Sequence, residues 1–157
     1  MHKIAFCGKA GSGKTTLSSY LAETYGFKKL SFADAVKEIA YKYFGMRKKD
    51  RGLLQQIGQK MRAIDKDIWV NILVNKLEYG QHLNIVIDDV RFLNEAKALK
   101  DKDFIIIKLI GRKWDMEPEQ MQDISETELE EIIPNYTLDT SKPIEETIKE
   151  LEKIVKA

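Results

Sequence analysis

GKAGSGKT, residues 8–15, is the stretch of this 157-residue sequence that decides its fold. It matches G-x-x-x-x-G-K-[ST], a loop whose backbone N–H groups converge on a phosphate. The match has meaning only with a strand before it and a helix after it. KIAFC at 3–7 is an apolar run typical of a buried parallel strand, and Leu17, Tyr20 and Leu21 have helical spacing after the loop. The sequence therefore predicts a site for the phosphates of a nucleoside triphosphate, and an ordinary glycine-rich turn is the weaker alternative.

The residue types in this loop each have a chemical role. Its glycines allow backbone conformations that other residues avoid, and the helix that follows adds the positive end of its dipole. Lys14 would reach the β- and γ-phosphates, exposed to phosphate and not to the core, and the Thr15 hydroxyl would bind Mg²⁺. We expect ATP to contact Gly8, Lys9, Ala10, Gly11, Ser12, Gly13, Lys14, Thr15 and Thr16.

The composition is that of one ordinary globular domain. Hydrophobic residues make up 43% and charged residues 32% of the chain. The net charge of +1 gives no reason to expect a nucleic acid or membrane partner. The single cysteine, Cys7, lies in a predicted strand, where packing is its expected role. There is no signal peptide pattern and no apolar run of about 18 residues. We expect a cytoplasmic protein, monomeric or homodimeric.

Short apolar runs and helical patterns alternate along the chain. The runs at 3–7, 29–32, 83–87, 104–110 and 135–139 predict strands. Helices are predicted after the phosphate loop up to Gly26, from Asp34 to Gly45, over 51–62, 68–77, 93–100 and 144–155, and between the last two strands. The order β-α-β-α-α-α-β-α-β-α-β-α predicts a doubly wound α/β fold: a mainly parallel five-stranded sheet with helices on both faces.

Two segments carry further expectations. Asp34 can cap the second helix, whose apolar face would consist of Val36, Ile39, Ala40, Tyr43 and Phe44. The segment 115–140 contains Asp and Glu but no Lys or Arg, which is typical of a solvated face or a mobile flap.

The helix predicted over 51–62 has a polar side. Arg51, Gln55, Gln59 and Arg62 follow at steps of four, four and three, so they share one face. A solvated surface is the alternative to a binding face. Gly58 adjoins this side, although glycine is about 1 kcal/mol less favourable than alanine inside a helix. Its presence indicates that another group, such as a ligand, approaches this side of the helix closely.

Polar groups gather where the predicted strands end. Ligands of doubly wound sheets bind beyond the carboxyl ends of the strands. An acid at the end of an apolar strand is where phosphate-loop enzymes hold their metal, so Asp88 or Asp89 would join Thr15 at Mg²⁺. The full set at this edge is the loop, Asp34, Asp88, Asp89, Arg91, Arg112, Lys113, Asp139, Thr140 and Ser141.

Four blocks in this order resemble the deoxynucleoside monophosphate kinases of bacteriophages, within the nucleoside monophosphate kinase superfamily. They are the loop at 8–15, SFADAVK at 31–37, LQQIGQKMR at 54–62 together with Trp69, and DVRFLNEA at 89–96. A Ser125-Glu126 pair also fits, and the similarity spans nearly the whole chain.

This resemblance implies roles for particular residues. Lys37, Arg62 and Arg91 would hold the acceptor phosphate, and Gln55 or Gln59 would contact its base. Asp34 belongs to the same substrate-binding set, in a monophosphate-binding helical region at about 33–80. A lid at about 111–126 would bring Arg112 and Lys113 to the transferring phosphoryl group. Lys14, Arg91 and Arg112 would be catalytic, and Arg112 would also contact ATP.

The reaction implied is transfer of the γ-phosphoryl group of ATP to a (deoxy)nucleoside 5′-monophosphate. Such transfer depends on positioning and charge neutralisation, and an acceptor phosphate is nucleophilic without a general base. One alternative is a small-molecule kinase that resembles phosphomevalonate kinase. Another is a nucleotide-dependent switch without transfer activity, although a switch needs no second cationic phosphate site.

Overall fold

The computed structural model of the chain describes residues 2–80, 83–111 and 124–157. The chain divides into two compact units, which are described separately below. One consists of residues 1–30 and 82–157, and the other of residues 31–81. The range of the second unit is close to the helical region that the resemblance assigns to monophosphate binding; that assignment stays a prediction.

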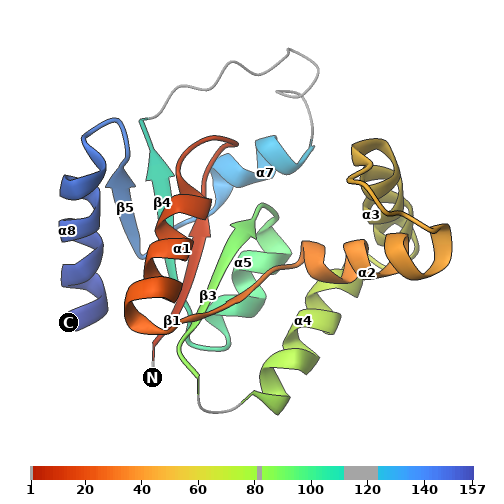
Figure 1. Ribbon diagram of the computed structural model, residues 1–157, viewed down its shortest axis with the longest axis horizontal. Helices are drawn as coiled ribbons and strands as arrows, with labels where there is room; N and C mark the ends of the chain where they lie inside the picture. Colours follow the sequence, from red (N-terminus) through yellow and green to blue (C-terminus); the bar gives the residue numbers. More distant parts are fainter. Residues whose placement is uncertain (1, 81–82, 112–123) are drawn as a thin grey trace. The chain divides into compact units, whose positions relative to one another are not determined.

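A five-stranded parallel sheet forms the centre of the first unit (Figure 1). The strand order is β2-β3-β1-β4-β5, and every neighbouring pair is parallel. The predicted fold class is therefore confirmed. The strands are β1 (Lys3–Cys7), β2 (Lys28–Leu30), β3 (Ile85–Val90), β4 (Ile105–Ile110) and β5 (Tyr136–Asp139).

Two strands end at residues other than the expected ones. β2 pairs with β3 only from Lys28 to Leu30, so it ends earlier than predicted. β3 continues to Val90, because pairing with β1 extends that far, and Asp88 and Asp89 therefore lie inside the strand.

Helices cover both faces of the sheet. Figure 1 shows α1 (Lys14–Tyr25) and α8 (Ile144–Lys156) on one face, and α5 (Leu93–Lys100) and α7 (Ile124–Glu131) on the other. Side chains alternate between the faces of a strand, so Ile4 and Phe6 point to the same side. They pack with Leu17, Leu21, Phe27, Val86, Ile107, Leu109, Leu138, Leu151 and Val155 in one buried cluster. Cys7 is also buried, and burial raises the pKa of its thiol to about 11.

The segment predicted as a solvated face or flap also contributes to the core. It contains α7, whose Leu129 is 2% exposed, and Ile132 just after the helix is buried. Lys108 Nζ on β4 donates to the carbonyl oxygens of Leu129 and Glu130 at 3.1 and 3.3 Å. These are last-turn carbonyls, where a cation is favoured. Residues 112–123 lie outside the described part of the chain.

A polar cluster joins α1 to α8. The hydroxyls of Tyr20 and Tyr25 donate to Glu152 Oε1 at 2.6 and 2.7 Å. These two hydrogen bonds, followed by the charge of Lys156, lower the pKa of Glu152. The same contact with Glu152 raises the pKa of Tyr20 to about 12.

The cluster predicts an acid-dependent contribution to stability. A carboxyl with a lowered folded-state pKa stabilises the protein above its unfolded pKa, and that stabilisation is lost as the pH falls through the folded value. We expect Tyr20→Phe to lower the Tm at neutral pH, and the difference from wild type to narrow below the ordinary Glu pKa of 4.5. Thermal melts between about pH 7 and about pH 3 measure this difference. A difference independent of pH would contradict the role of Glu152.

The described residues of the second unit form three helices, α2 (Ala33–Phe44), α3 (Arg51–Ile64) and α4 (Ile68–Tyr79). The Asp50 side chain caps α3 by accepting from Leu53 N at 3.0 Å. Trp69 is 3% exposed, and its indole Nε1 donates to the Gly58 carbonyl oxygen at 3.2 Å. Trp69 therefore fixes the start of α4 against the middle of α3.

Two expectations for α2 are wrong. The helix begins at Ala33, so Asp34 lies in its first turn, where its carboxylate accepts from the Ser31 N–H at 3.1 Å. Tyr43 and Phe44 were expected on the apolar face, but they are 79% and 60% exposed. The buried face of α2 ends at Ala40, and helical periodicity does not show where the covering residues stop.

Among the described residues, no helix has the length and apolar character needed to cross a bilayer.

Candidate active site

The loop at 8–15 connects β1 to α1 in a conformation that depends on glycine. Gly11 and Gly13 have φ of 76° and 102°, values that other residues rarely adopt. At Gly8, a Cβ would stand 2.6 Å from Ser12 Oγ and 2.9 Å from the Leu109 carbonyl oxygen, so a larger residue would push the loop away from β4. The sequence pattern and the observed geometry thus agree on a tight strand-to-helix loop.

The polar groups of this loop fit an anionic ligand. Ser12 Oγ is buried, and no described group forms a hydrogen bond with it. A buried hydroxyl without a partner is rare and calls for a ligand or an ordered water. Lys14 Nζ donates to the carbonyl oxygens of Gly8 and, at 3.0 Å, Lys9. Lys14 is 8% exposed, and its ammonium is held by the loop itself. Its contact with phosphate stays a prediction.

The residues present also fit Mg²⁺. The described residues contain no group of three or more His, Cys, Asp or Glu side chains that could enclose a metal. Mg²⁺ does not need one, because it commonly takes one or two protein ligands together with water and substrate phosphates. Thr15 is exposed in the first turn of α1, and Asp88 and Asp89 are half-buried on β3.

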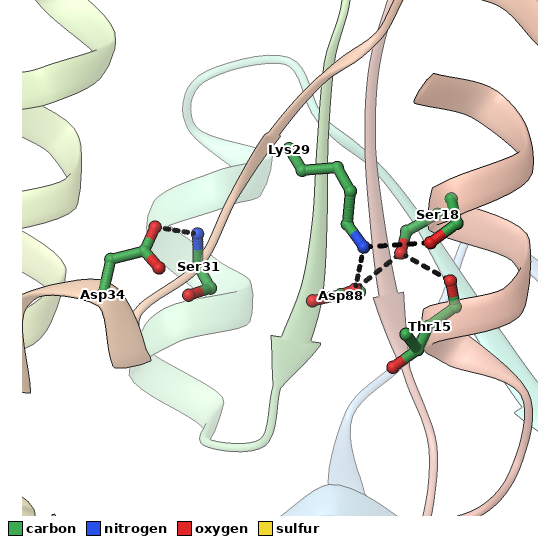
Figure 2. A network of polar contacts seen from close by, with 7 residues as sticks. Thr15, Ser18, Lys29, Ser31, Asp34 and Asp88 are labelled. Carbon is green, nitrogen blue, oxygen red and sulfur yellow. Dashed lines mark hydrogen bonds and ion pairs between the residues drawn. The ribbon is translucent and has the colours of Figure 1, made fainter. Parts of the chain in front are cut away.

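Asp88 belongs to a polar network between β3, α1 and β2 (Figure 2). Ser18 Oγ, which follows Thr15 by one helical turn, donates to Asp88 Oδ2 at 2.5 Å. Lys29 Nζ on β2 lies 3.5 Å from the same carboxylate oxygen and donates to Ser19 Oγ at 3.2 Å. The sequence pattern did not indicate Ser18 or Lys29, because their partner lies far along the chain.

A bulge in β3 accompanies this network. Ala5 pairs with Ile87, but Cys7 pairs with Val90, so β3 advances three residues while β1 advances two. The extra residue lies at Asp88-Asp89. Bulges are common beside active sites, where they re-aim a side chain.

Arg91 follows β3 in a turn that a buried carboxylate holds. Glu95 is 3% exposed, and its Oε1 accepts from the backbone N–H groups of Arg91 and Phe92 at 2.9 and 3.0 Å. Glu95 stands third in α5, where a glutamate commonly reaches back to the residue before the helix. The usual capping signature was absent from the sequence, because the residue before the helix is Phe92 and not Ser or Thr. The carboxylate fixes the backbone from which the half-buried Arg91 extends.

The second unit holds the other predicted acceptor residues. Figure 2 shows Asp34 beside Ser31, to which it is hydrogen-bonded. Lys37 on α2 is exposed, as are Gln55 and Gln59 on α3. Arg62 is half-buried, one turn beyond Gln59. α3 confirms that Gln55, Gln59 and Arg62 have helical positions on one side. Their contact with an acceptor stays a prediction.

The side of Gly58 on which a side chain would stand faces open space among the described residues. A Cβ built there meets nothing within 4 Å, so packing against another described element does not explain this glycine. We expect Gly58→Ala to fold and to gain about 1 kcal/mol, because alanine is the better helix former. Chemical denaturation measures that gain, and the KM of each substrate reports on the ligand interpretation. A raised acceptor KM in the stabilised variant would show that a ligand approaches Gly58, whereas unchanged KM values would exclude it.

The ends of β4 and β5 lie close together. Gly111 has a φ of 94°, and a Cβ there would stand 2.2 Å from Asp139 Oδ1. That oxygen accepts from Ser141 N at 2.9 Å and from Ser141 Oγ at 2.6 Å, and these bonds lower the pKa of Asp139. The predicted lid residues Arg112 and Lys113 follow Gly111 and lie outside the described residues.

Comparison with known proteins places this geometry in a family. The family described as "AAA domain" matches residues 4–110. A protein of Acanthamoeba polyphaga mimivirus, named "Putative deoxynucleotide monophosphate kinase", is 30% identical over 142 residues, covering 68% of this chain and 72% of that protein. "Uncharacterized protein ORF77" of Ictalurid herpesvirus 1 (strain Auburn) is 33% identical over 102 residues, or 61% of this chain. The chain spans only 45% of that herpesvirus protein.

Solved structures show the same fold at low sequence identity. Shikimate kinase from Bacteroides thetaiotaomicron aligns with a TM-score of 0.62 at 16% identity and covers 99% of both chains. A gluconokinase from Sinorhizobium meliloti 1021 aligns with a TM-score of 0.57 at 17% identity, covering 95% of this chain and 88% of its own. The resemblance to kinases of the phosphate-loop type, first seen in the sequence, is thereby confirmed. The chain belongs to the AAA domain family, and its fold is that of the P-loop kinases.

Proposed function

We propose that this protein transfers the γ-phosphoryl group of ATP to a (deoxy)nucleoside 5′-monophosphate and releases the two diphosphates. The observation that carries the proposal is the loop at 8–15, with its buried Lys14 ammonium and the Ser12 hydroxyl, which has no hydrogen-bond partner among the described residues. The mimivirus relative supports the class of acceptor through its name.

In this mechanism the loop binds the donor. Its backbone N–H groups and Lys14 neutralise the β- and γ-phosphates, while the dipole of α1 adds to the same field. Lys14 exchanges its carbonyl partners in the loop for phosphate oxygens. Mg²⁺, held by Thr15 and by Asp88 or Asp89, supplies charge neutralisation at the phosphates when it is bound.

The acceptor is bound by cationic and amide side chains. Lys37, Arg62 and Arg91 hold its phosphate, and Gln55 or Gln59 contacts its base. Asp34 is also assigned to the substrate-binding residues. Arg112 contacts the transferring group from the lid, beside Lys113. No general base is required, because an acceptor phosphate is ionised at neutral pH.

A panel of acceptors tests this proposal. ADP formation from ATP and Mg²⁺ is measured with each ribo- and deoxynucleoside monophosphate, and phosphomevalonate serves as the small-molecule control. We expect turnover with at least one nucleoside monophosphate and none with phosphomevalonate. Turnover with phosphomevalonate alone would reassign the acceptor class. Tight ATP binding without turnover on any acceptor would instead identify a nucleotide-dependent switch.

A further inference from the structure

Three consecutive backbone N–H groups follow β3, and carboxylates from two helices accept all of them. Arg91 and Phe92 donate to Glu95 Oε1 on α5. Leu93 N donates to Glu128 Oε1 on α7 at 3.1 Å. We propose that Glu128 is a positioning residue for Arg91, because it completes the support of the turn that carries this arginine. The inference rests on the proposed function, in which Arg91 holds the acceptor phosphate.

The hydrogen bond from Leu93 meets a need at the start of α5. Leu93 is the first residue of this helix, and the first four N–H groups of a helix have no partner within it. The residue before the helix is Phe92, which has no side-chain oxygen that could cap it. A carboxylate is a favoured partner there, because a helix N-terminus carries a partial positive charge. Glu128 therefore supplies from α7 a cap that Phe92 cannot supply.

α7 holds Glu128 in place. The next residue, Leu129, is 2% exposed. Lys108 Nζ on β4 donates to the carbonyl oxygens of Leu129 and Glu130. Glu128 itself is half-buried. Ordering a side chain costs conformational entropy, and less of it remains to be lost when the backbone and part of the side chain are already held. The contact with Leu93 can therefore restrain the turn.

The same stretch of α7 also reaches the phosphate loop. Glu130 Oε1 lies 3.3 Å from Lys9 Nζ. Both side chains are exposed, so this ion pair contributes little to stability. It does show that residues 128–130 lie beside both the phosphate loop and the turn at 91–93. Glu128 is the residue of this stretch that contacts the acceptor side of the proposed site.

The sign of the expected effect separates positioning from charge. Glu128 is negative, and the proposed acceptor carries a phosphate. If Glu128 acted only through its electric field, its removal would favour the acceptor, because like charges repel. Weaker acceptor binding after its removal therefore indicates support of the Arg91 turn. Glu128→Gln separates the two effects, since the amide oxygen can still accept from Leu93 without a charge.

The first measurement is acceptor affinity, which needs no turnover. Calorimetric titration gives the Kd of the nucleoside monophosphate with the fastest turnover, using protein saturated with a non-hydrolysable ATP analogue. We expect Glu128→Ala to raise this Kd by about three- to tenfold, because a small misplacement of a binding group is costly. Glu128→Gln should stay within about twofold of wild type. The matched control is Glu131→Ala, which removes an exposed glutamate of the same helix and should leave the Kd unchanged.

A double-mutant cycle tests whether Glu128 acts through Arg91. In an Arg91→Met background the arginine is absent, so Glu128→Ala should cause no further loss of acceptor affinity. Amide hydrogen exchange tests the contact itself and needs no acceptor. Glu128→Ala should speed exchange at the Leu93 amide by about tenfold, whereas Glu131→Ala should not.

Several results would overturn the inference. An acceptor Kd that Glu128→Ala leaves unchanged or lowers would exclude a positioning role, and a full loss in Glu128→Gln would assign the effect to charge. An equal further loss in the Arg91→Met background would show that Glu128 does not act through Arg91. Unchanged exchange at Leu93 would exclude the contact. Failure of the proposed function looks different: wild-type protein would turn over no nucleoside monophosphate, while exchange at Leu93 would still respond to Glu128→Ala.

Discussion

Replacement of Lys14 by alanine is expected to reduce kcat by about 100- to 1,000-fold, the loss typical of removing one preorganised group that stabilises transition-state charge. The Lys14 ammonium lies inside the loop on the carbonyl oxygens of Gly8 and Lys9, and in the proposed mechanism it exchanges these partners for phosphate oxygens. Steady-state kinetics with ATP and the best acceptor measure the effect.

A control must separate this loss from a disturbed loop. Lys14→Ala removes two hydrogen bonds within the loop, so a modest fall in Tm is expected, with far-UV circular dichroism unchanged. Lys156→Ala serves as the matched variant, because it removes an exposed lysine at the end of α8. The Lys156 ammonium forms a long ion pair, of 3.7 Å, with Glu152. Unchanged turnover in well-folded Lys14→Ala protein would remove Lys14 from the mechanism.

Substitution of Arg62 by lysine is expected to raise the acceptor KM by about tenfold or more, because charge-assisted hydrogen bonds contribute about 1.5–3 kcal/mol each. A guanidinium can grip a phosphate with two parallel hydrogen bonds, which an ammonium cannot reproduce. The KM for ATP should barely change, since its phosphates are bound by the loop at 8–15. Steady-state kinetics with each substrate varied in turn measure the acceptor KM and the ATP KM separately.

Arg51 supplies the matched control for this experiment. It is exposed at the start of α3 on the same side as Arg62, so Arg51→Lys makes the same chemical change outside the predicted acceptor set. We expect it to alter neither KM. If Arg62→Lys raises the KM of both substrates equally, Arg62 is structural. If it raises neither KM, that side of α3 is a solvated surface.

The sequence by itself determined the fold class, the order of the elements and the phosphate loop. These features are local. Each depends only on residues nearby in the sequence, as do the glycines of the loop, the apolar run at 3–7 and the helix end at Gly26. Gly26 indeed ends α1 with a φ of 69°, the left-handed conformation expected of a glycine there. The face of α3 with Gln55, Gln59 and Arg62 was equally readable, because helical spacing alone defines it.

Tertiary structure alone decided which hydrogen-bond partners the acidic residues have and which apolar side chains are buried. Ser18 and Asp88 are 70 positions apart, so no periodicity links them until β3 lies beside α1. Tyr43 and Phe44 continue a helical apolar pattern, yet they stay exposed because burial requires a covering element. α7 is the opposite case: its sequence surroundings are acidic, but Leu129 is buried, and α7 packs against α5. The sequence pattern of a segment indicates its preferred secondary structure. Its contacts depend on which other segments of the chain pack against it.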